Sequence, residues 1–516
     1  MLLVYLLWSF LVSPGRSQVF DFRDVTTDSG LSAPLLGMMG HAAAWGDFDR
    51  DGLPDLFVGG FCDRPDSDYL PAKKPVPTRL FRNLGNGKFE VVKKSPTEFF
   101  SRTSGALFAD LNNDGFPELY VANHSKKEAS QRNEPQATAE KMRNRLFRNA
   151  RGKLIDFSKE SGSCPPDLLA ARNVAVFDYN ADGLLDVFLV EDKFRTDNRQ
   201  ARSLLLKNTG NLKFQIANGE AGIPNDLFGL GLALADLNND GLPEIFLPHS
   251  NRWLLSGPGR KYREVMQLNS TLRWNPLDTE DWPCGAAFGD LNLDGRLDLV
   301  ISIHHEPARN KVFINKGLRD GIPVFEDVTA KVGLGLPVPA KSPHVEIQDF
   351  DNDGLPDLYF SAAWKNGQRV IPLIYRNAGI AKTGLPYFVP PQQIKPPMIY
   401  FPAGPTVDFN RDGGLDIFLV NWFRGESFHL LKNQTRRGNW LQVKAPIGTK
   451  VRVFSNGKLV GFQQVYIGFG YASGQLPVCH FGLRDLKSVD LEITLPDGTV
   501  QRSNKVQVNR IMEFPE

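Results

Sequence analysis

The stretch Asp47-Phe-Asp-Arg-Asp-Gly-Leu-Pro-Asp55 sets the pattern for most of this sequence. Successive copies of the nine-residue pattern start 54 to 68 residues apart, and the six further copies begin at Asp110, Asp178, Asp236, Asp290, Asp349 and Asp408. Chance does not produce seven copies at so regular a spacing. Self-similarity at a fixed period is the signature of proteins built from one repeated structural unit. We therefore expect seven equivalent units in this chain of 516 residues.

The residue types in the pattern indicate a calcium site. In every copy, positions 1, 3 and 5 are Asp or Asn, position 6 is Gly and position 9 is Asp or Glu. Calcium takes about six to eight oxygen ligands in a flexible shell, and the Gly allows the tight wrap that lets alternate side chains converge. With the carbonyl of position 7 and the carboxylate of position 9, the predicted ligands for up to seven Ca²⁺ ions are Asp47, Asp49, Asp51, Leu53, Asp55; Asp110, Asn112, Asp114, Phe116, Glu118; Asp178, Asn180, Asp182, Leu184, Asp186; Asp236, Asn238, Asp240, Leu242, Glu244; Asp290, Asn292, Asp294, Arg296, Asp298; Asp349, Asp351, Asp353, Leu355, Asp357; and Asp408, Asn410, Asp412, Gly414, Asp416.

The first three ligand positions also resemble an EF-hand loop, which is a different fold. An EF-hand needs a Glu at position 12 and helices on both sides. Position 12 is apolar in every copy here, namely Val58, Val121, Leu189, Leu247, Ile301, Phe360 and Leu419. The sequence therefore excludes EF-hands.

The flanks of the acidic loops predict short buried strands. Val174–Phe177 precedes the third loop and Val187–Val190 follows it, and both are apolar runs bounded by turn residues. A third phrase, such as Leu80-Phe-Arg-Asn83, and a fourth, such as Phe325-Glu-Asp-Val-Thr329, follow in the repeats. Four strands in each of seven repeats predict an all-β, seven-bladed β-propeller, a closed ring that leaves no long sheet edge.

The two ends of the repeat region predict how the ring closes. Phe22-Arg-Asp-Val-Thr26 matches the fourth-strand phrase but has no blade in front of it, and the seventh repeat lacks a fourth strand of its own. We expect the N-terminal strand to complete the last blade. Before it, the apolar run Met1–Val12 is too short to span a bilayer and resembles an export signal. The expected organisation is a signal peptide at 1–17, the propeller at 18–436 and a small β-rich C-terminal domain at 437–516.

At this point the sequence resembles a known family. The repeats resemble the FG-GAP/VCBS type of integrin α chains and of many secreted bacterial proteins. Asn439-Trp-Leu-Gln-Val443, Gly448-Thr-Lys-Val-Arg-Val453 and Gly470-Tyr-Ala-Ser-Gly-Gln475 resemble the ASPIC/UnbV C-terminal domain, as do His480–Leu483 and Leu495–Thr499. Together they resemble the cartilage acidic protein family, although this chain is slightly basic and has no Cys-rich tail. The resemblance implies extracellular calcium binding and adhesion or matrix contact.

Composition and charge bound the classes of partner. Apolar residues make up 41 % and charged residues 23 %, which excludes a disordered tail, a collagen or a coiled coil. The formal charge is +2, so it indicates neither nucleic acid nor any other partner. Each bound Ca²⁺ adds two charges, and seven would raise the formal charge to +16. A polyanion such as an acidic polysaccharide is therefore a plausible partner; we expect no membrane span and a monomer.

Histidines form a second pattern. Four of the eight, His124, His249, His304 and His305, follow the start of an acidic loop by 13 to 15 residues, and Asp192 and Trp422 occupy the same phase in other repeats. This phase lies in the loop after the second strand, on the face opposite the calcium loops. Because equivalent loops ring the central channel, the six side chains are candidates to converge on one ligand or a transition metal. The alternative is a set of unrelated, solvated loop residues.

These observations favour a binding protein over an enzyme. The sequence contains no nucleophile elbow, P-loop, dinucleotide fingerprint or CxxC motif, and we expect no catalytic site. The expected function is a secreted calcium-binding propeller that acts as an extracellular binding or adhesion module for matrix or cell-surface ligands. A lectin-like binder of carbohydrate or acidic polysaccharide is the second hypothesis. A carbohydrate-active enzyme on a propeller scaffold is the third.

Overall fold

The computed structural model describes residues 20–124, 143–165, 170–193, 201–265, 268, 282–367, 369–391, 397–435 and 437–514. The signal peptide predicted at 1–17 lies outside these residues. Strands dominate the described chain, and its helices are single turns: α1 (Ser32–Leu35), η1 (Asp66–Asp68), α4 (Ser158–Ser161), α5 (Asn218–Ala221) and η2 (Pro248–Ser250).

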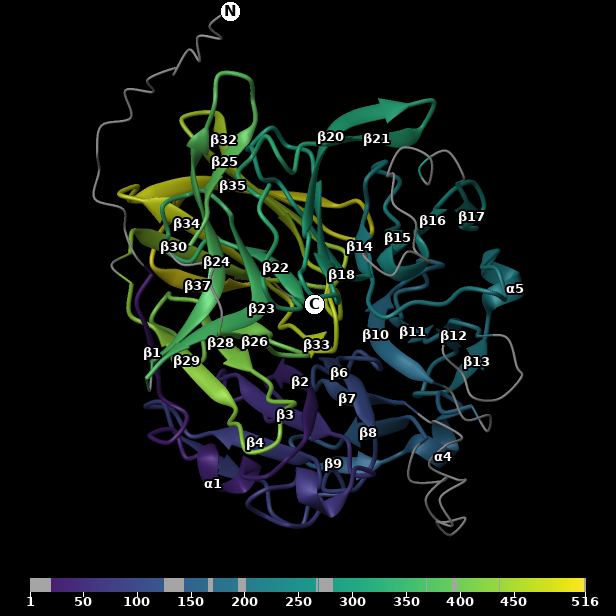
Figure 1. The fold of residues 1–516 in the computed structure, drawn as a ribbon. Helices are drawn as coiled ribbons and strands as arrows, with labels where there is room; N and C mark the ends of the chain where they lie inside the picture. The colour runs from purple at the N-terminus through teal and green to yellow at the C-terminus, as the bar shows by residue number, and fades with distance from the viewer. Residues whose placement is uncertain are drawn as a thin grey trace, which may run out of the picture.

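Seven blades, each built on four antiparallel strands, follow one another around a ring, from purple through teal to green in Figure 1, and two of them carry a fifth strand. The first three are β2 (Gly40–Gly46), β3 (Asp55–Gly60), β4 (Arg79–Asn83), β5 (Phe89–Val91); β6 (Thr103–Ala109), β7 (Glu118–Asn123), β8 (Arg145–Asn149), β9 (Leu154–Asp156); and β10 (Ala171–Phe177), β11 (Asp186–Glu191), β12 (Leu204–Asn208), β13 (Phe214–Ile216). The fourth and fifth are β14 (Ala233–Ala235), β15 (Glu244–Leu247), β16 (Arg252–Leu255), β17 (Arg263–Glu264); and β18 (Pro283–Gly289), β19 (Asp298–Ile303), β20 (Lys311–Arg319), β21 (Ile322–Asp327). The sixth is β22 (Val345–Gln348), β23 (Asp357–Asn366), β24 (Arg369–Ile380), β25 (Pro386–Val389), with β26 (Met398–Tyr400) beside β23. The predicted all-β propeller is confirmed.

The seventh blade is assembled from both ends of the repeat region. It consists of β27 (Thr406–Val407), β28 (Asp416–Leu419) and β29 (His429–Asn433), and its fourth strand is β1 (Phe22–Asp24). β1 pairs antiparallel with β29, so that Phe22 faces Asn433. The Asp24 carboxylate also lies 2.6 Å from the His429 ring. Closure of the ring by the N-terminal strand is therefore confirmed.

The C-terminal residues form two more sheets. One has the order β34 (Val478–Arg484), β30 (Asn439–Lys444), β37 (Arg510–Glu513), and the other β32 (Lys458–Gln464), β31 (Lys450–Ser455), β35 (Ser488–Thr494), β36 (Val500–Gln507). Their inner faces share a core that includes Leu441, Val451 and Leu491. These yellow strands overlap the later blades in Figure 1.

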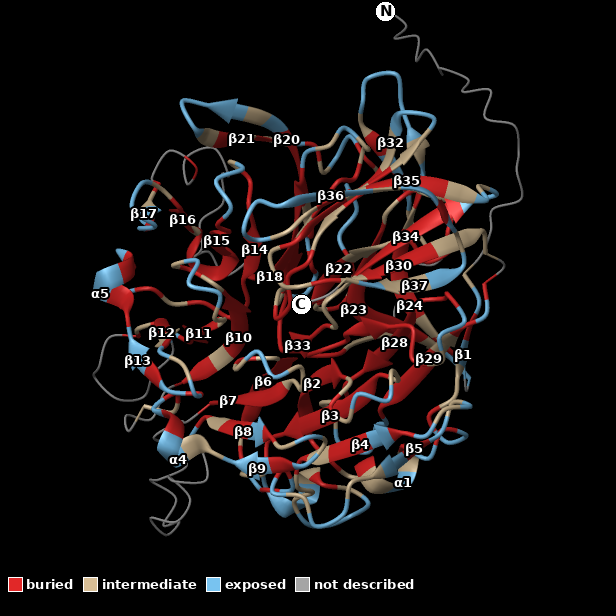
Figure 2. Cartoon of the chain, turned by 180° about the vertical axis from the view of Figure 1, so that it is seen from behind, coloured by how far each residue is buried: buried red, intermediate tan, exposed pale blue. Residues whose placement is uncertain are grey.

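A loop of the C-terminal domain runs into the centre of the ring. β33 (Ser473–Gly474) pairs in parallel with β2, and both views place it among the first strands of the blades (Figures 1 and 2). The Gly470 N–H donates to the carbonyls of Leu232 and Ala286, and the Asn173 amide donates to the carbonyl of Gly468 at 3.0 Å. We call residues 466–475 the inserted segment. It joins the first strands of several blades at the propeller axis, where Figure 2 shows buried chain on all sides.

Candidate functional site

All seven acidic loops connect the first and second strands of a blade, and they share one backbone conformation. The residue at position 4 is left-handed in every loop, with φ between 50° and 63°, and the Gly at position 6 has φ between 81° and 88°. The N–H of that Gly donates to the position-1 carboxylate at 2.7 to 3.2 Å in all seven loops. The tight wrap predicted from the Gly is confirmed, because only Gly adopts this φ without strain.

The position-9 carboxylates tie each loop to its own blade. One oxygen accepts the N–H of position 2, and the other accepts an N–H at the end of the third strand, at 2.7 to 3.3 Å throughout. In six blades the third-strand donor is an Asn, such as Asn149, whose side-chain amide also donates to Pro117 of its own loop and to Phe48 of the preceding blade. That this Asn links neighbouring blades by hydrogen bonds was not predicted from the sequence, although the Asn recurs at the same place in six repeats.

The loop carboxylates are buried enough to need a compensating positive charge. Burial raises the pKa of Asp55, Glu118 and Glu244 to about 8, and the pKa of Asp290 to about 7. The Asp47 Oδ1 atom is also buried without a hydrogen-bond partner. A bound cation would balance the negative charge of these carboxylates and lower their pKa, so that they stay ionised.

Two loops bring three carboxylates together. Oxygens of Asp47, Asp49 and Asp55 lie within 4.8 Å of one another, as do those of Asp349, Asp351 and Asp353. These are the repeats with Asp rather than Asn at position 3. The donor sets consist of oxygen atoms alone, which suits a hard divalent cation such as Ca²⁺.

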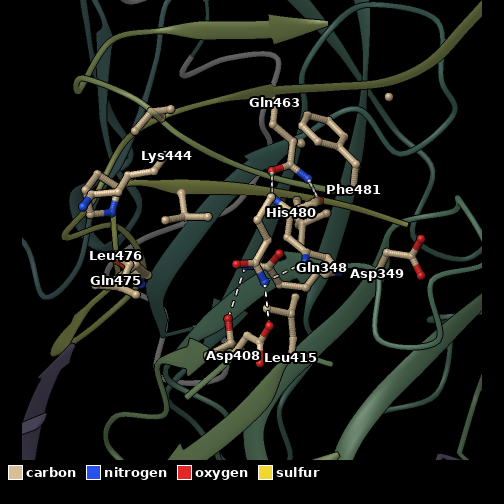
Figure 3. Close-up of a pocket in the computed structure, with 18 of the residues that line it drawn as sticks. Gln348, Asp349, Asp408, Leu415, Lys444, Gln463, Gln475, Leu476, His480 and Phe481 are labelled. Atoms are coloured by element: carbon tan, nitrogen blue, oxygen red, sulfur yellow. Dashed lines mark hydrogen bonds between the residues drawn. The ribbon is translucent and has the colours of Figure 1, made fainter. Parts of the chain in front are cut away.

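The C-terminal domain covers part of the face that carries the acidic loops. A cavity of about 170 Å³ lies between them, and Asp47, Asp290, Asp349 and Asp408 contribute to its wall. From the other side the Gln442 amide donates at 3.0 Å to Asp408, which is labelled in the cavity wall in Figure 3. His480 lies in the same wall, with its Nε2 2.7 Å from the Asn352 side-chain oxygen. This face of the propeller is therefore partly closed to a large ligand.

On the opposite face, most of the predicted ligand-face residues do converge. The His124 Nε2 atom lies 3.5 Å from the Asp192 carboxylate, and Arg172 binds the same carboxylate at 2.7 Å. The His304 ring centroid lies 6.2 Å from that of Trp282, which in turn stacks on His249 at 5.9 Å.

Trp422 joins the same group through side chains that the sequence did not single out. Its ring lies 5.2 Å from that of His41 and 5.0 Å from that of Phe61. Among the described residues, the ring contacts do not include His305, which is half-buried with an unpartnered Nδ1 atom. We call the following residues the opposite-face cluster: His41, Phe61, His124, Arg172, Asp192, His249, Trp282, His304, Tyr400, Trp422 and Tyr471.

Tyr471 is the member of the opposite-face cluster that comes from the C-terminal domain. It lies in the inserted segment, and its hydroxyl is 3.3 Å from the His41 Nε2 atom. Its ring centroid is 6.3 Å from that of His304. The inserted segment therefore extends from the acidic-loop side of the ring to the opposite-face cluster.

Burial disfavours the charged form of the cluster histidines. Burial lowers the pKa of His124 and His304 to about 3 and that of His249 to about 4, and the positive charge of Arg172 contributes to each shift. Among the residues that the structure describes, the groups of three metal-capable side chains contain no histidine.

Comparison with known protein families identifies both parts of the chain. The family described as FG-GAP-like repeat matches residues 178–247 and 290–360, and the family described as ASPIC and UnbV matches residues 442–516. The chain carries FG-GAP-like repeats and an ASPIC/UnbV domain. The resemblance expected from the motifs is thereby confirmed.

Relatives over most of the chain are cartilage acidic proteins. Human cartilage acidic protein 1 is 22 % identical, with 99 % of this chain and 77 % of the relative covered. The mouse protein is 24 % identical, and the match covers 80 % of this chain and 64 % of the mouse protein. Among solved structures, a rhamnogalacturonan lyase from Bacillus licheniformis is 13 % identical, covers 92 % of this chain and 73 % of its own, and has a TM-score of 0.36. No helix among the described residues is long and apolar enough to cross a membrane.

Proposed function

We propose that this protein is a secreted, calcium-binding β-propeller that acts as an extracellular binding or adhesion module, with no catalytic role. FG-GAP-like repeats and the cartilage acidic protein relatives support an adhesion-type module outside the cell. Seven loops with one backbone and all-oxygen donors support Ca²⁺ as the resident ion. The ions organise the loops, and the ligand binds elsewhere.

The observation that carries the location of the ligand site is the difference between the two faces. The C-terminal domain covers part of the acidic-loop face, whereas the opposite-face cluster includes the half-buried side chains of Trp282, His304, Tyr400 and Trp422. Aromatic side chains with polar neighbours are the usual lining of ligand sites. The proposed ligand therefore binds at the opposite-face cluster.

A binding experiment with matched variants tests this placement. Immobilised extracellular matrix from candidate host tissue is incubated with the wild-type chain, with Trp422→Ala and with Tyr387→Ala, each with and without EDTA. Tyr387 is a matched control because it is an aromatic residue 54 % exposed on β25, outside the cluster. We expect Trp422→Ala to lose binding at least tenfold while Tyr387→Ala retains it. Equal retention by all three proteins would contradict a ligand site at the cluster.

A polyanionic glycan is the second candidate ligand, because cations accompany the aromatic rings of the cluster. The Arg64 guanidinium lies 5.4 Å from the Trp422 ring centroid, the Lys341 ammonium 5.5 Å from that of Tyr400, and Arg102 stacks over Phe61 at 4.1 Å. Sugars stack on aromatic rings, and sulfate or carboxylate groups pair with nearby cations. A glycan array with sulfated, uronic-acid and neutral members separates this candidate from protein adhesion: we expect salt-sensitive binding to the acidic members if the ligand is a glycan.

A further inference from the structure

The fourth acidic loop, residues 236–244, has the same backbone as the other six. Asn239 is left-handed with φ 63°, Gly241 has φ 88°, and the Gly241 N–H donates to Asp236 at 2.9 Å. The backbone of this loop therefore does not differ from that of the other six. The difference lies in the side chains that contact its carboxylates.

A lysine of the C-terminal domain enters this loop. Lys450, the first residue of β31, places its Nζ atom 2.7 Å from the Asp236 carboxylate and 2.9 Å from the Asn239 side-chain oxygen. Both members of the ion pair are buried, with side chains 10 % and 2 % exposed. The ammonium group is therefore held away from water beside the Asp236 Oδ2 atom, the oxygen that also accepts the Gly241 N–H.

The cations beside other acidic loops are placed differently. Arg82 pairs with positions 3 and 5 of the first loop, Arg376 with positions 3 and 5 of the sixth, and Arg437 with position 5 of the seventh. These guanidinium groups contact the carboxylates at positions 3 and 5, and the side chains of Arg82 and Arg376 are 45 % and 27 % exposed. Among the ion pairs of the described residues, Lys450 is the cation that reaches a position-1 carboxylate.

The carboxylates at positions 5 and 9 of the fourth loop also accept hydrogen bonds from side chains. Ser256 stands where six repeats have the third-strand Asn, and its hydroxyl lies 2.7 Å from both the Asp240 and the Glu244 carboxylates. The Asn238 amide donates to the same two carboxylates at 3.1 and 2.9 Å. Positions 5 and 9 therefore contact hydrogen-bond donors of the chain itself, while at position 1 the Asp236 Oδ2 atom is engaged and the Oδ1 atom is buried without a hydrogen-bond partner.

A second contact from the C-terminal domain fixes the loop backbone. The Gln464 side chain accepts the Asp236 N–H at 2.9 Å and donates to the Asp236 carbonyl at 3.0 Å. Lys450 and Gln464 lie on the neighbouring strands β31 and β32 and face each other in register. The loop is therefore held from one sheet by a charge contact and a backbone contact together.

We propose that the fourth repeat binds no divalent ion, because the Lys450 ammonium is its built-in cation and fastens the C-terminal domain to the propeller. A Ca²⁺ ion at this loop would share the Asp236 carboxylate with a buried like charge, which is strongly unfavourable. The inference rests on the proposed calcium binding by the other loops. It predicts that the chain takes at most six Ca²⁺ ions.

Counting bound ions tests the inference. Native mass spectrometry of the intact chain, equilibrated with excess Ca²⁺, gives the number of ions for the wild type, for Lys450→Met and for Lys458→Met. Lys458 is the matched control, because it begins β32 and is exposed. We expect Lys450→Met to bind one ion more than the wild type, and Lys458→Met to bind the same number as the wild type.

The outcomes separate this inference from the proposed function. A seventh ion in the wild type, or a folded Lys450→Met that gains none, overturns the role of Lys450. Absence of bound Ca²⁺ from every protein overturns calcium binding itself. Should Lys450→Met fail to fold, a terbium-soaked crystal of the wild type decides: an anomalous peak between Asp236 and Glu244 refutes the inference, and peaks confined to other loops support it.

Discussion

Closure of the ring by β1 predicts a specific loss of stability when Phe22 is truncated. Phe22 is 4 % exposed, packs edge-on against Phe350 with ring centroids 6.1 Å apart, and belongs to a core with Ile417 and Leu431. Replacing a buried Phe by Ala costs about 3–5 kcal/mol in a well-packed core. β1 is an outer strand of only three residues, so the surrounding chain can relax. We therefore expect the free energy of unfolding to fall by about 3 kcal/mol in Phe22→Ala.

The fold supplies its own comparison for this variant. Phe214 of β13 faces Asn208 in the third blade as Phe22 faces Asn433 in the seventh, and Phe214 is 7 % exposed. The two residues are equivalent except that Phe214 belongs to a blade made from one continuous stretch of chain. If β1 is a full member of its blade, Phe22→Ala and Phe214→Ala have similar costs. Tyr387→Ala, an exposed aromatic on a fourth strand, is expected to change stability by less than about 0.5 kcal/mol.

Urea unfolding in saturating Ca²⁺, followed by tryptophan fluorescence and by far-UV circular dichroism, measures the three variants. Agreement of the two probes shows that each variant unfolds in one step. A loss below about 0.5 kcal/mol in Phe22→Ala, alongside a loss of about 3 kcal/mol in Phe214→Ala, would refute closure by the N-terminal strand. The ring would then close through contacts of the inner strands alone.

Further predictions concern ions, protons and the contacts between blades. EDTA is expected to lower the melting temperature, because each Ca²⁺ site filled at ten times its dissociation constant adds about 1.4 kcal/mol; a melt indifferent to EDTA contradicts this. In EDTA, stability should fall as the pH rises from 6 to 8, because burial raises the pKa of Asp55, Glu118 and Glu244 to about 8, so the folded chain holds protons that the unfolded chain releases. In saturating Ca²⁺ the melting temperature should instead fall from pH 7 to pH 5. Burial lowers the pKa of His480, His124 and His304 to about 3, so the unfolded chain takes up these protons first, and His480→Gln should remove its share of this slope. Asn149→Ala should cost about 2–4 kcal/mol in urea unfolding, since the buried Phe48 carbonyl and the partly buried Pro117 carbonyl lose their donor, whereas Ala at the exposed Gln215 should cost almost nothing.

Features that depend on local chain chemistry were predictable from the sequence. The Gly at position 6 and the Asp at position 1 specify the loop wrap within six residues, and the apolar runs beside them specify the first and second strands. Closure was predictable because Phe22–Thr26 repeats a phrase found at the end of a complete blade. In each case the interacting residues recur at the same position of the repeat, so several copies support the same structural prediction.

Features that depend on contacts made once in the molecule were not predictable. His41 lies on the first strand, outside the phase that marked His124 and Trp422, whereas Phe61 shares that phase but was not singled out, so the cluster was only partly recognised. Tyr471 and Lys450 approach from the C-terminal domain, more than 200 residues from His41 and Asp236 in the chain. No periodicity marks a contact that occurs in one repeat alone.

The inserted segment explains a feature of the sequence that the blade pattern leaves open, namely the small residues of the first strands. A Cβ atom on Gly474 would lie 2.8 Å from that of Ala44 and 2.4 Å from the Ala106 carbonyl. A Cβ atom on Gly470 would lie 2.3 Å from the His344 ring. Larger residues on the first strands or in the inserted segment would leave no room for the segment. The Ala and Gly residues of the first strands and the Gly residues of the segment therefore match each other in size. The C-terminal domain therefore supplies part of the propeller's own core. The boundary near residue 436 separates two sequence families but does not separate two independent packing units.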